Sequence, residues 1–358
     1  MEWKEDILGN VLEVKYGKDH KKLAEGQYPV YGSGGLMRYV DSKLYDGPSI
    51  LIPRKGTLNN IMFVESPFWT VDTMFWTIIN TDKIDPKFLF YSICKRDFAS
   101  MNVGSAVPSM TVSILNDIQI SYPKNLDDQR RIASILSSLD RKIELNNKIN
   151  ADLEEMAQAI FKNWFVDFEP FKDGKFVDSE LGMIPEGWKV GCLGDIAEIT
   201  SGKRPPKKSK DKTKDLFIPL IGASDIMGFT SDVLYERPIL VIGRVGTHGV
   251  VQRFQEKCWS SDNTLVIESS YYNYVYQLLK RIDYSAINRG STQPLITQTD
   301  VKNTDVIIAP ENVLKEYESI TSTLFSKHRA NNKENSRLSL LRDTLLPRLM
   351  SGELEVPE

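Results

Sequence analysis

The sequence predicts a mixed α/β (α+β) protein in which two tandem globular α/β domains are joined by two long antiparallel coiled-coil helices, with a pseudo-two-fold relation between the halves. Three observations predict this fold. The chain repeats itself, each half starts with short β-type runs and glycine-rich turns, and each half ends in a long stretch with a seven-residue apolar repeat. A length of 358 residues is sufficient for two or three domains with cores of their own.

The internal duplication is the most informative of the three observations. The segment Trp3–Lys18 aligns without gaps on Trp188–Lys203, with seven identical residues at a shift of 185 positions. Further along, Ile50–Thr57 matches Leu240–Thr247, and the loops, tryptophans and prolines that follow also match in the same order. Two halves that agree in this order indicate a tandem duplication.

Each half divides into a globular part and a helical part. The expected boundaries are 1–123 for the first globular domain, 124–168 for the central helix, 169–183 for a linker, 184–310 for the second globular domain and 311–358 for the C-terminal helix. Each globular part also holds one helix of its own. In the first, Asp85 followed by a proline is a good helix start and predicts a helix through Phe88–Met101, with Tyr271–Ile287 as its counterpart.

Both long helices carry a heptad repeat. The first series of seam positions is Ile132, Leu139, Asn146, Leu153 and Ile160 in one helix, and Leu324, Asn331, Leu338 and Leu345 in the other. The second series is predicted at Ile135, Lys142, Ile149 and Met156, and at Ile320, Lys327, Glu334 and Leu341. Each helix could pack only on its own domain, but the matching frames favour packing of the helices on each other.

The two asparagines of the seam, Asn146 and Asn331, occupy matching positions. A polar residue at such a position lowers stability but fixes the register of a helix pair. A helix of about 35 residues at ~1.5 Å per residue is roughly 50 Å long. One turn of B-DNA is about 34–36 Å long. Two globular domains on such a spacer could therefore reach one face of a duplex about a turn apart.

Several loops carry residue types that suit DNA. Arg54–Asn60 offers cations, amides and a glycine, and Arg244–Gly249 is its counterpart. Arginine reads guanine, and asparagine or glutamine reads adenine, through paired hydrogen bonds in the major groove. The alternative for each residue is a plain β-turn with solvated charge. The predicted DNA-contacting residues of these loops are Lys18, Arg38, Arg54, Lys55, Thr57, Asn59, Asn60 and Ser105 in the first half, and Arg244, Thr247, His248, Ser291, Thr292 and Gln293 in the second.

The segment 203–214 is a stronger electrostatic signal. It carries one acidic residue, Asp211, and seven cations: Lys203, Arg204, Lys207, Lys208, Lys210, Lys212 and Lys214. Prolines and the lack of apolar periodicity predict an exposed loop, which could be merely solvated or could contact phosphates without reading bases. The first half has fewer cations at the matching place, so we expect the halves to read different sequences.

No catalytic or metal-binding motif is found in the sequence. No Gly-Lys pair is followed by Ser or Thr, which excludes a Walker A loop, and no methyl-donor or nuclease motif is present. The three cysteines, Cys94, Cys192 and Cys258, form no C-x-x-C pair, so neither a disulfide framework nor a zinc site is expected. The net charge of −3 leaves DNA binding open, because local charge decides it. The sequence has no apolar run that could cross a membrane and no signal peptide, which predicts a cytoplasmic protein.

Motifs spread along the whole chain resemble the specificity subunit of type I restriction-modification systems. They are Ile50–Thr57, Asp128–Ala133 before the first long helix, Ala159–Phe168 after it, Gly182–Trp188 at the start of the second globular part, and Leu345–Leu354 near the end of the chain. Together these motifs are specific, although each alone is weak.

The resemblance implies that the globular domains are target-recognition domains, each reading one half of a bipartite asymmetric site in double-stranded DNA. It also implies that the helices dock methyltransferase subunits, two of them by symmetry. S-adenosylmethionine is then expected on the methyltransferase partner, which methylates adenine N6, and ATP and Mg on the motor and nuclease partner. This chain itself is expected to need no cofactor and to catalyse no reaction.

Two other functions remain open at this point. The chain could be a cryptic DNA-modifying enzyme with unfamiliar motifs, although the missing nucleotide and methyl-donor motifs argue against it. It could also be a coiled-coil scaffold that binds only protein, although two different sets of loops on matching frameworks argue against that.

Overall fold

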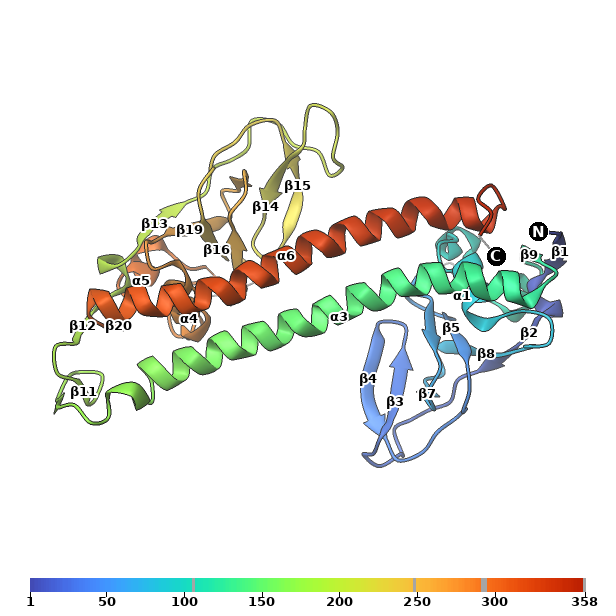
Figure 1. The fold of residues 1–358 in the computed structure, drawn as a ribbon, viewed down its shortest axis with the longest axis horizontal. Coiled ribbons are helices and arrows are strands. Elements are labelled where there is room, and N and C mark those ends of the chain that lie inside the picture. The colour runs from blue at the N-terminus through green and yellow to red at the C-terminus, as the bar shows by residue number, and fades with distance from the viewer. Residues whose placement is uncertain (105–106, 247–248, 291–294, 357–358) are drawn as a thin grey trace. The chain divides into compact units, whose positions relative to one another are not determined.

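The structure, a computed structural model, describes residues 1–104, 107–246, 249–290 and 295–356. The chain forms two compact units, of which the first comprises Met1–Asn147 with Asn332–Glu358 and the second comprises Lys148–Asn331. Each unit therefore contains one globular domain and one half of each long helix (Figure 1). None of the helices within the described ranges is apolar over a length that could cross a membrane.

The globular domain of the first unit is built from short strands in three sheets. Its strands are β1 (Trp3–Ile7), β2 (Leu12–Tyr16), β3 (Tyr28–Gly32), β4 (Gly35–Val40), β5 (Ser49–Pro53), β6 (Met62–Val64), β7 (Trp69–Thr70), β8 (Met74–Ile79) and β9 (Gln119–Pro123). The sheets have the strand orders β2-β8-β5-β6, β4-β3-β7 and β1-β9. All five residues of β5 are buried, which explains why it reads as a continuous apolar run. Two helices, α1 (Pro86–Ile93) and α2 (Val112–Asn116), complete the domain.

The second unit repeats this plan. Its strands are β10 (Phe176–Val177), β11 (Ile184–Pro185), β12 (Lys189–Cys192), β13 (Glu198–Ser201), β14 (Ile218–Ile221), β15 (Ile226–Thr230), β16 (Ile239–Gly243), β17 (Val251–Phe254), β18 (Trp259–Ser260), β19 (Thr264–Glu268) and β20 (Asp305–Ile308). The orders β13-β19-β16-β17, β15-β14-β18 and β12-β20 reproduce the three sheets of the first unit, and β10-β11 is an additional pair. The helices α4 (Tyr272–Arg281) and α5 (Gln298–Lys302) match α1 and α2. The predicted duplication is confirmed strand by strand.

The two short helices end earlier than predicted. Asp85 caps α1 as expected, because its side chain accepts a hydrogen bond from Phe88 N at 2.9 Å. The helix stops at Ile93, however, and a separate 3-10 helix covers Phe98–Met101. Asp97 starts this second helix by accepting a hydrogen bond from Ser100 N, so a continuous helix through residue 101 was wrong.

The counterpart helix α4 also ends before the predicted residue 287. Ile282 is extended directly after Arg281, and Asp283 then accepts a hydrogen bond from Ser285 N at 3.0 Å. Such an aspartate turn competes with helix continuation. In both halves, therefore, an acidic residue a few positions after the last turn redirects the chain.

The long helices α3 (Leu126–Phe165) and α6 (Glu311–Met350) pair in opposite directions within each unit. In the first unit Arg342 lies against Asp140 while Asn335 lies against Asn146. In the second unit Asn331 lies against Asn150. The helices thus pack on each other, as predicted, and they also contribute to the cores of the globular domains.

Every member of the first predicted series of seam residues is buried or half-buried. The second series does not hold at Met156 and Leu341, although its members Lys142 and Glu334 form an ion pair across the helices at 3.4 Å. Met156 is 50% exposed and Leu341 is 46% exposed, whereas their neighbours Ala157 and Arg342 face the seam. The more buried second series is Leu136, Ile143, Asn150 and Ala157 in α3, and Thr321, His328, Asn335, Arg342 and Leu349 in α6.

This correction gives each seam asparagine a partner. Asn146 Nδ2 donates to Asn335 Oδ1 at 2.8 Å, and Asn331 Nδ2 donates to Asn150 Oδ1 at 2.9 Å. The two pairs occupy equivalent positions of the duplicated helices, one pair in each unit. Asn146 Nδ2 also donates to Glu334 Oε2 at 2.8 Å. A buried amide whose partners lie only at the correct offset penalises a shifted register.

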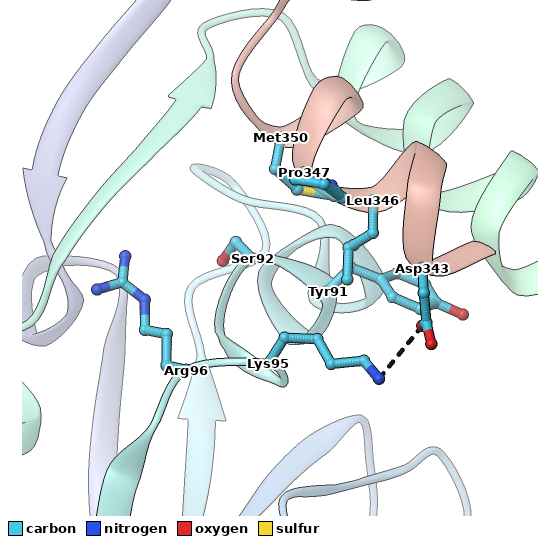
Figure 2. Close-up of a pocket in the computed structure, with 8 residues that line it drawn as sticks. All are labelled: Tyr91, Ser92, Lys95, Arg96, Asp343, Leu346, Pro347 and Met350. Carbon is cyan, nitrogen blue, oxygen red and sulfur yellow. Dashed lines mark ion pairs between the residues drawn. The ribbon is translucent and has the colours of Figure 1, made fainter. Parts of the chain in front are cut away.

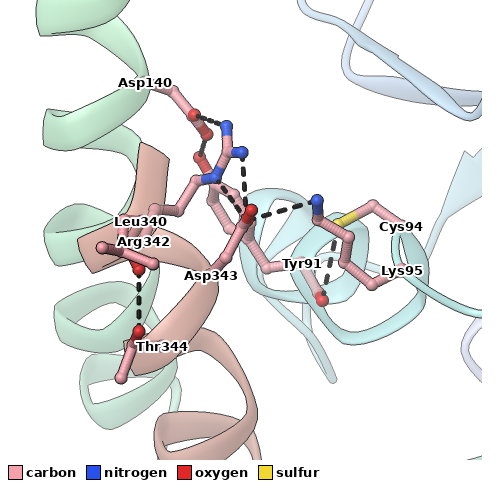
Figure 3. Close-up of polar contacts among 8 residues, drawn as sticks. All are labelled: Tyr91, Cys94, Lys95, Asp140, Leu340, Arg342, Asp343 and Thr344. Carbon is pink, nitrogen blue, oxygen red and sulfur yellow. Dashed lines mark hydrogen bonds and ion pairs between the residues drawn. The ribbon is translucent and has the colours of Figure 1, made fainter. Parts of the chain in front are cut away.

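A polar network holds the first globular domain on the helix pair (Figure 3). The Tyr91 hydroxyl on α1 donates to Asp140 Oδ2 at 2.6 Å, and Arg342 donates to Asp140 Oδ1 at 2.6 Å. Arg342 also pairs with Asp343 at 3.0 Å, and Lys95 reaches the same Asp343 carboxylate at 3.2 Å. Side chains from α1, α3 and α6 are therefore linked through two carboxylates.

Beside this network lies an open pocket of about 470 Å³ (Figure 2). Its lining comes from two places. Helix α1 and the residues just after it contribute Tyr91, Ser92, Lys95 and Arg96, and the last turns of α6 contribute Asp343, Leu346, Pro347 and Met350. Burial and the nearby Asp140 raise the pKa of the Tyr91 phenol far above its ordinary value, so it acts only as a hydrogen-bond donor to that carboxylate.

Candidate nucleic-acid interface

The first basic segment, residues 18–26, begins directly after Gly17, which follows strand β2 and has no room for a side chain. A Cβ atom on Gly17 would lie 2.0 Å from the carbonyl oxygen of Val71. Lys18 follows, its backbone N donating to Thr70 O at 2.9 Å, and the Trp69 indole donates to the Lys18 carbonyl at 2.9 Å. The predicted DNA-contacting residue Lys18 is thus held by its backbone while its side chain remains available.

The second basic segment has the same anchor. A Cβ atom on Gly202 would lie 2.1 Å from Ser261 O, Lys203 N donates to Ser260 O at 2.9 Å, and the Trp259 indole donates to the Lys203 carbonyl at 2.7 Å. The identical Gly-Lys pairs of the sequence are therefore structural, and they fix where each variable segment begins.

The segment 203–214 runs over the surface as an exposed loop, as predicted. All seven of its cationic side chains are exposed, and none takes part in an ion pair with another described residue. The loop is held midway by Ser209, which exchanges two backbone hydrogen bonds with Phe229 of β15 at 2.8 and 2.9 Å. A row of unpaired cations on a fixed loop is an arrangement that can bind phosphates.

In the first unit Arg38 is used inside the protein. Its guanidinium donates to the carbonyls of His20 and Leu23 at 3.0 and 2.7 Å, and the Asp41 amide donates to Ala24 O at 3.1 Å. The predicted DNA contact Arg38 therefore holds the basic segment against β4, a role that the sequence did not indicate.

Arg54 and its neighbours line the next loop. Arg54 lies 5.3 Å from the centre of the exposed Tyr16 ring and donates to the Asp72 carbonyl at 3.3 Å, which directs the guanidinium along the surface. Lys55 and Thr57 of the same loop are exposed. The loop backbone is fixed because Arg54 N donates to Thr73 O at 2.8 Å.

The two asparagines of this loop have partners within the protein. Asn59 Oδ1 accepts from Ala99 N at 2.9 Å, and its amide donates to Asp97 at 3.2 Å. Asn60 donates to Ser33 O at 2.8 Å, which ties the loop to the turn between β3 and β4. Both amides support the loop, whereas their residue type alone predicted adenine recognition.

Arg244, the counterpart of Arg54, is half-buried, and its backbone is fixed by Asn263 O and Ile296 N at 2.9 and 3.0 Å. Six predicted contacts lie outside the described residues: Ser105, Thr247, His248, Ser291, Thr292 and Gln293. The sequence reasoning missed the asparagines that flank two of these loops. Asn102 Oδ1 accepts from Gly104 N at 2.8 Å and Asn288 Oδ1 accepts from Gly290 N at 3.0 Å, and an asparagine two residues before a glycine was the available signal.

Burial raises the pKa of the Cys94 and Cys258 thiols to about 11, so neither is a thiolate at neutral pH. Within the described ranges there is no group of three or more His, Cys, Asp or Glu side chains placed to hold a metal ion.

Two segments of the chain, residues 1–155 and 185–340, each match the family described as the type I restriction modification DNA specificity domain. The chain belongs to this family. Each matched segment starts with a globular domain and runs into a long helix, so the family domain coincides with the structural repeat. The protein is accordingly a type I DNA specificity subunit with two target-recognition domains.

Relatives along the full length support the assignment. The MjaIX specificity subunit of Methanocaldococcus jannaschii is 30% identical over 94% of this chain and 86% of its own length. The HindI specificity subunit of Haemophilus influenzae is 23% identical over 82% of this chain and 83% of its own. The crystal structure of a type I S subunit from M. genitalium has the same fold, with a TM-score of 0.68, 17% identity, and coverage of 97% of this chain and 96% of that one.

Proposed function

We propose that this specificity subunit reads a bipartite asymmetric DNA site and performs no chemistry itself. Residues 1–123 would bind one half of the site and residues 184–310 the other. The main support for the proposal is that the equivalent pairs Gly17-Lys18 and Gly202-Lys203 begin surface segments of different charge. The second segment holds seven cations and one acid, whereas the first, residues 18–26, holds Lys18, Lys21 and Lys22 against Asp19 and Glu25. Two domains with the same fold but differently charged segments suit two different half-sites.

The available side chains suggest a division of labour at the DNA. The exposed lysines of residues 203–214 suit phosphates, because they are long, solvated and unpaired with other described residues. Lys55, Thr57 and Arg244 lie on fixed loops and are the described residues best placed to approach base edges.

The helices α3 and α6 would set the separation of the domains and dock methyltransferase subunits. Because the helix pair is duplicated, we propose two such subunits, one for each half of the chain. S-adenosylmethionine would be bound by them, ATP and Mg by a motor and nuclease subunit, and no cofactor by this chain. The complex would act in the cytoplasm, where it meets double-stranded DNA.

The test is to express this chain with its methyltransferase subunit and to map adenine methylation across the host genome. The proposal predicts one split motif, and it predicts that exchanging residues 184–310 for those of a relative changes one half of the motif only. Methylation or cleavage of DNA by this chain alone would instead show a cryptic enzyme. An assembled complex with an active methyltransferase and no sequence motif would show a scaffold.

A further inference from the structure

Matching hairpins in the two domains expose the same kind of apolar pair. In the hairpin of β3 and β4, Leu36 and Met37 are 52% and 56% exposed. In the hairpin of β14 and β15, Ile226 and Met227 are 43% and 48% exposed. Single exposed apolar residues need no explanation, but the same pair at the same place in both repeats does.

A β-bulge directs the methionine of each pair. Met37 is the additional residue between the pairs Tyr31↔Leu36 and Val30↔Arg38 of the first hairpin. Met227 is the additional residue between Ile221↔Ile226 and Leu220↔Gly228 of the second. A bulge inserts one unpaired residue and turns its side chain, and such features often lie beside functional sites.

A glycine makes room for each methionine. A Cβ atom on Gly32 would lie 2.6 Å from Met37 Sδ, and one on Gly222 would lie 3.3 Å from Met227 Cβ. Both domains therefore combine a glycine at or just after the end of the first strand, a bulge in the second strand and an exposed methionine, although the residues around these positions differ.

The basic segments are attached to the strands that carry these methionines. In the second domain Ser209, between Lys208 and Lys210, forms its two backbone hydrogen bonds with Phe229, and a Cβ atom on Gly228 would lie 2.3 Å from Ser209 O. In the first domain Arg38, which directly follows Met37, holds the carbonyls of the basic segment. Each apolar pair therefore borders a basic segment, with seven cations and one acid in the second domain and three lysines and two acids in the first.

The turn of each hairpin also contacts the element on its other side. Asn60 donates to Ser33 O at 2.8 Å, next to Lys55 and Thr57, and Gln252 of β17 donates to Gly222 O at 2.8 Å. The apolar pair of the first domain thus lies between the basic segment and the Arg54–Asn60 loop, which are the two surfaces proposed above to meet DNA.

We infer that the hairpins enter the major groove and that Leu36–Met37 and Ile226–Met227 contact thymine methyl groups, one set in each half-site. This inference rests on the proposed function. A two-stranded β-ribbon fits the major groove, and the only apolar group that base edges present there is the thymine C5-methyl. An apolar pair bordered by cations matches a methyl group bordered by phosphates. Two side chains are also too few for a protein interface, which needs about 800 Å² from each partner.

The experiment uses the complete complex with its methyltransferase and duplexes that carry the mapped site. Each thymine of the site is replaced in turn by deoxyuridine, which removes only the methyl group. We expect at least one replacement in each half-site to weaken binding about fourfold, the value for one buried methyl-sized group.

The variant Leu36→Ala with Met37→Ala should lose the deoxyuridine effect in one half-site and keep it in the other. The variant Ile226→Ala with Met227→Ala should show the reverse pattern. A matched control is Leu181→Ala with Met183→Ala, a leucine and methionine pair in the linker that is 44% and 54% exposed and lies away from the hairpins.

Three results would overturn the inference. They are a half-site in which no deoxyuridine changes the affinity, a hairpin variant that keeps the effect in both halves, and a hairpin variant that loses its methyltransferase instead of its DNA affinity. A duplex with a scrambled site separates these results from failure of the proposed function, because only that failure makes the complex bind the scrambled and the mapped site equally.

Discussion

The two globular domains are attached to the same helix pair by different chemistry. In the second unit the attachment is aromatic: the ring of Phe165 lies 4.6 Å from that of Tyr274 and 5.0 Å from that of Tyr317, measured between centres. Trp188 packs against the same Phe165 at 5.7 Å. At the equivalent positions the first unit has Met350, Leu89, Ile132 and Trp3.

The first unit has fewer aromatic rings at these positions, and ion pairs and hydrogen bonds attach its domain to the helices. Tyr91, Asp140, Arg342 and Lys95 form the network of Figure 3, whereas the equivalent Tyr276 and Lys280 both bind the single carboxylate of Glu154, at 3.0 and 2.7 Å. Topology and helix register are therefore the same in both units, while the contacts that hold each domain differ.

Removing the central ring should have the largest effect. Phe165→Ala leaves a cavity among Tyr274, Tyr317 and Trp188, and we expect a loss of about 3–5 kcal/mol in the stability of the second unit. The loss would be measured by urea unfolding, followed by tryptophan fluorescence. Met350→Ala, the matched change in the first unit, should cost less, because Met350 is half-buried. Equal losses from both variants would contradict an aromatic attachment in one unit only.

We expect the basic segment 203–214 to contribute more to DNA binding than the basic segment of the first domain. Replacing Lys207, Lys208, Lys210 and Lys212 by alanine removes up to four phosphate contacts, and each contact contributes about 0.9 to the slope of log K against log salt. We expect affinity at physiological salt to fall about 10- to 100-fold, with a flatter salt dependence and an unchanged sequence motif.

Binding of the complete complex between about 0.05 and 0.2 M salt would measure this effect. Lys21→Ala with Lys22→Ala is the matched change in the first domain, and it should reduce the slope by less. A change in the recognised bases would show that residues 203–214 read sequence.

The polar network of the first unit should show coupling that its counterpart lacks. Tyr91→Phe removes the hydrogen bond to Asp140, and we expect it to cost about 1 kcal/mol. Arg342→Met removes the other donor to that carboxylate. Because both donors serve one acceptor, the double variant should differ from the sum of the single variants by about 0.5 kcal/mol or more.

Chemical denaturation of the four proteins of this cycle gives the coupling energy. Tyr276→Phe in the second unit, combined with the same Arg342→Met, is the control pair and should be additive. Additive losses in the first pair would show that the network is a set of independent contacts.

Most of the fold could be predicted from the sequence, because the duplication and the long helices leave repeating signals. The second seam series could not be assigned, since spacings of three and four residues both give a seven-residue repeat. The partner asparagines Asn150 and Asn335 would have decided it. They follow Asn146 and Asn331 by four residues, and pairing them places four amides on one seam.

The candidate site was less predictable than the fold. Residue type alone marked Arg38, Asn59 and Asn60 as DNA contacts, but their hydrogen-bonding groups serve the protein backbone or Asp97. Exposure and partner choice depend on which loops meet in three dimensions, and residue type carries no such information. Lys55 and the cations of 203–214 were easier, because unpaired charge on a loop is normally exposed.

We expect single and paired substitutions of the seam asparagines to change stability in opposite directions. Asn146→Leu alone removes the donor to Asn335 Oδ1 and to Glu334 Oε2 and should destabilise the first unit by about 1 kcal/mol. Asn146→Leu with Asn335→Leu removes both amides and should stabilise it, while allowing the helices to shift. Melting temperature and the mapped spacer length of the DNA site measure the two effects.

Asn331→Leu with Asn150→Leu is the equivalent change in the second unit and should behave in the same way. A paired variant with lower stability and an unaltered spacer would mean that the amides stabilise the helices and do not set their register.

The smallest expected difference between the units depends on pH. The seam position of His328 is occupied by Ile143 in the first unit. Burial lowers the pKa of His328 below its ordinary value, and the Arg253 charge acts in the same direction while Glu154 opposes it. The unfolded chain therefore binds a proton more readily than the folded one below about pH 6.5.

Stability from this group is present above that pH and is lost as the pH falls through 6.5 towards the lower folded value. Between pH 7.5 and 5.5 we expect the second unit to lose a small part of its stability through His328, because solvent screens this half-buried imidazole. The loss should disappear in His328→Leu and persist in Ile143→Leu, as measured by the difference in melting temperature between the two pH values. Because carboxylates elsewhere titrate equally in all three proteins, only the difference between variants reports on this imidazole.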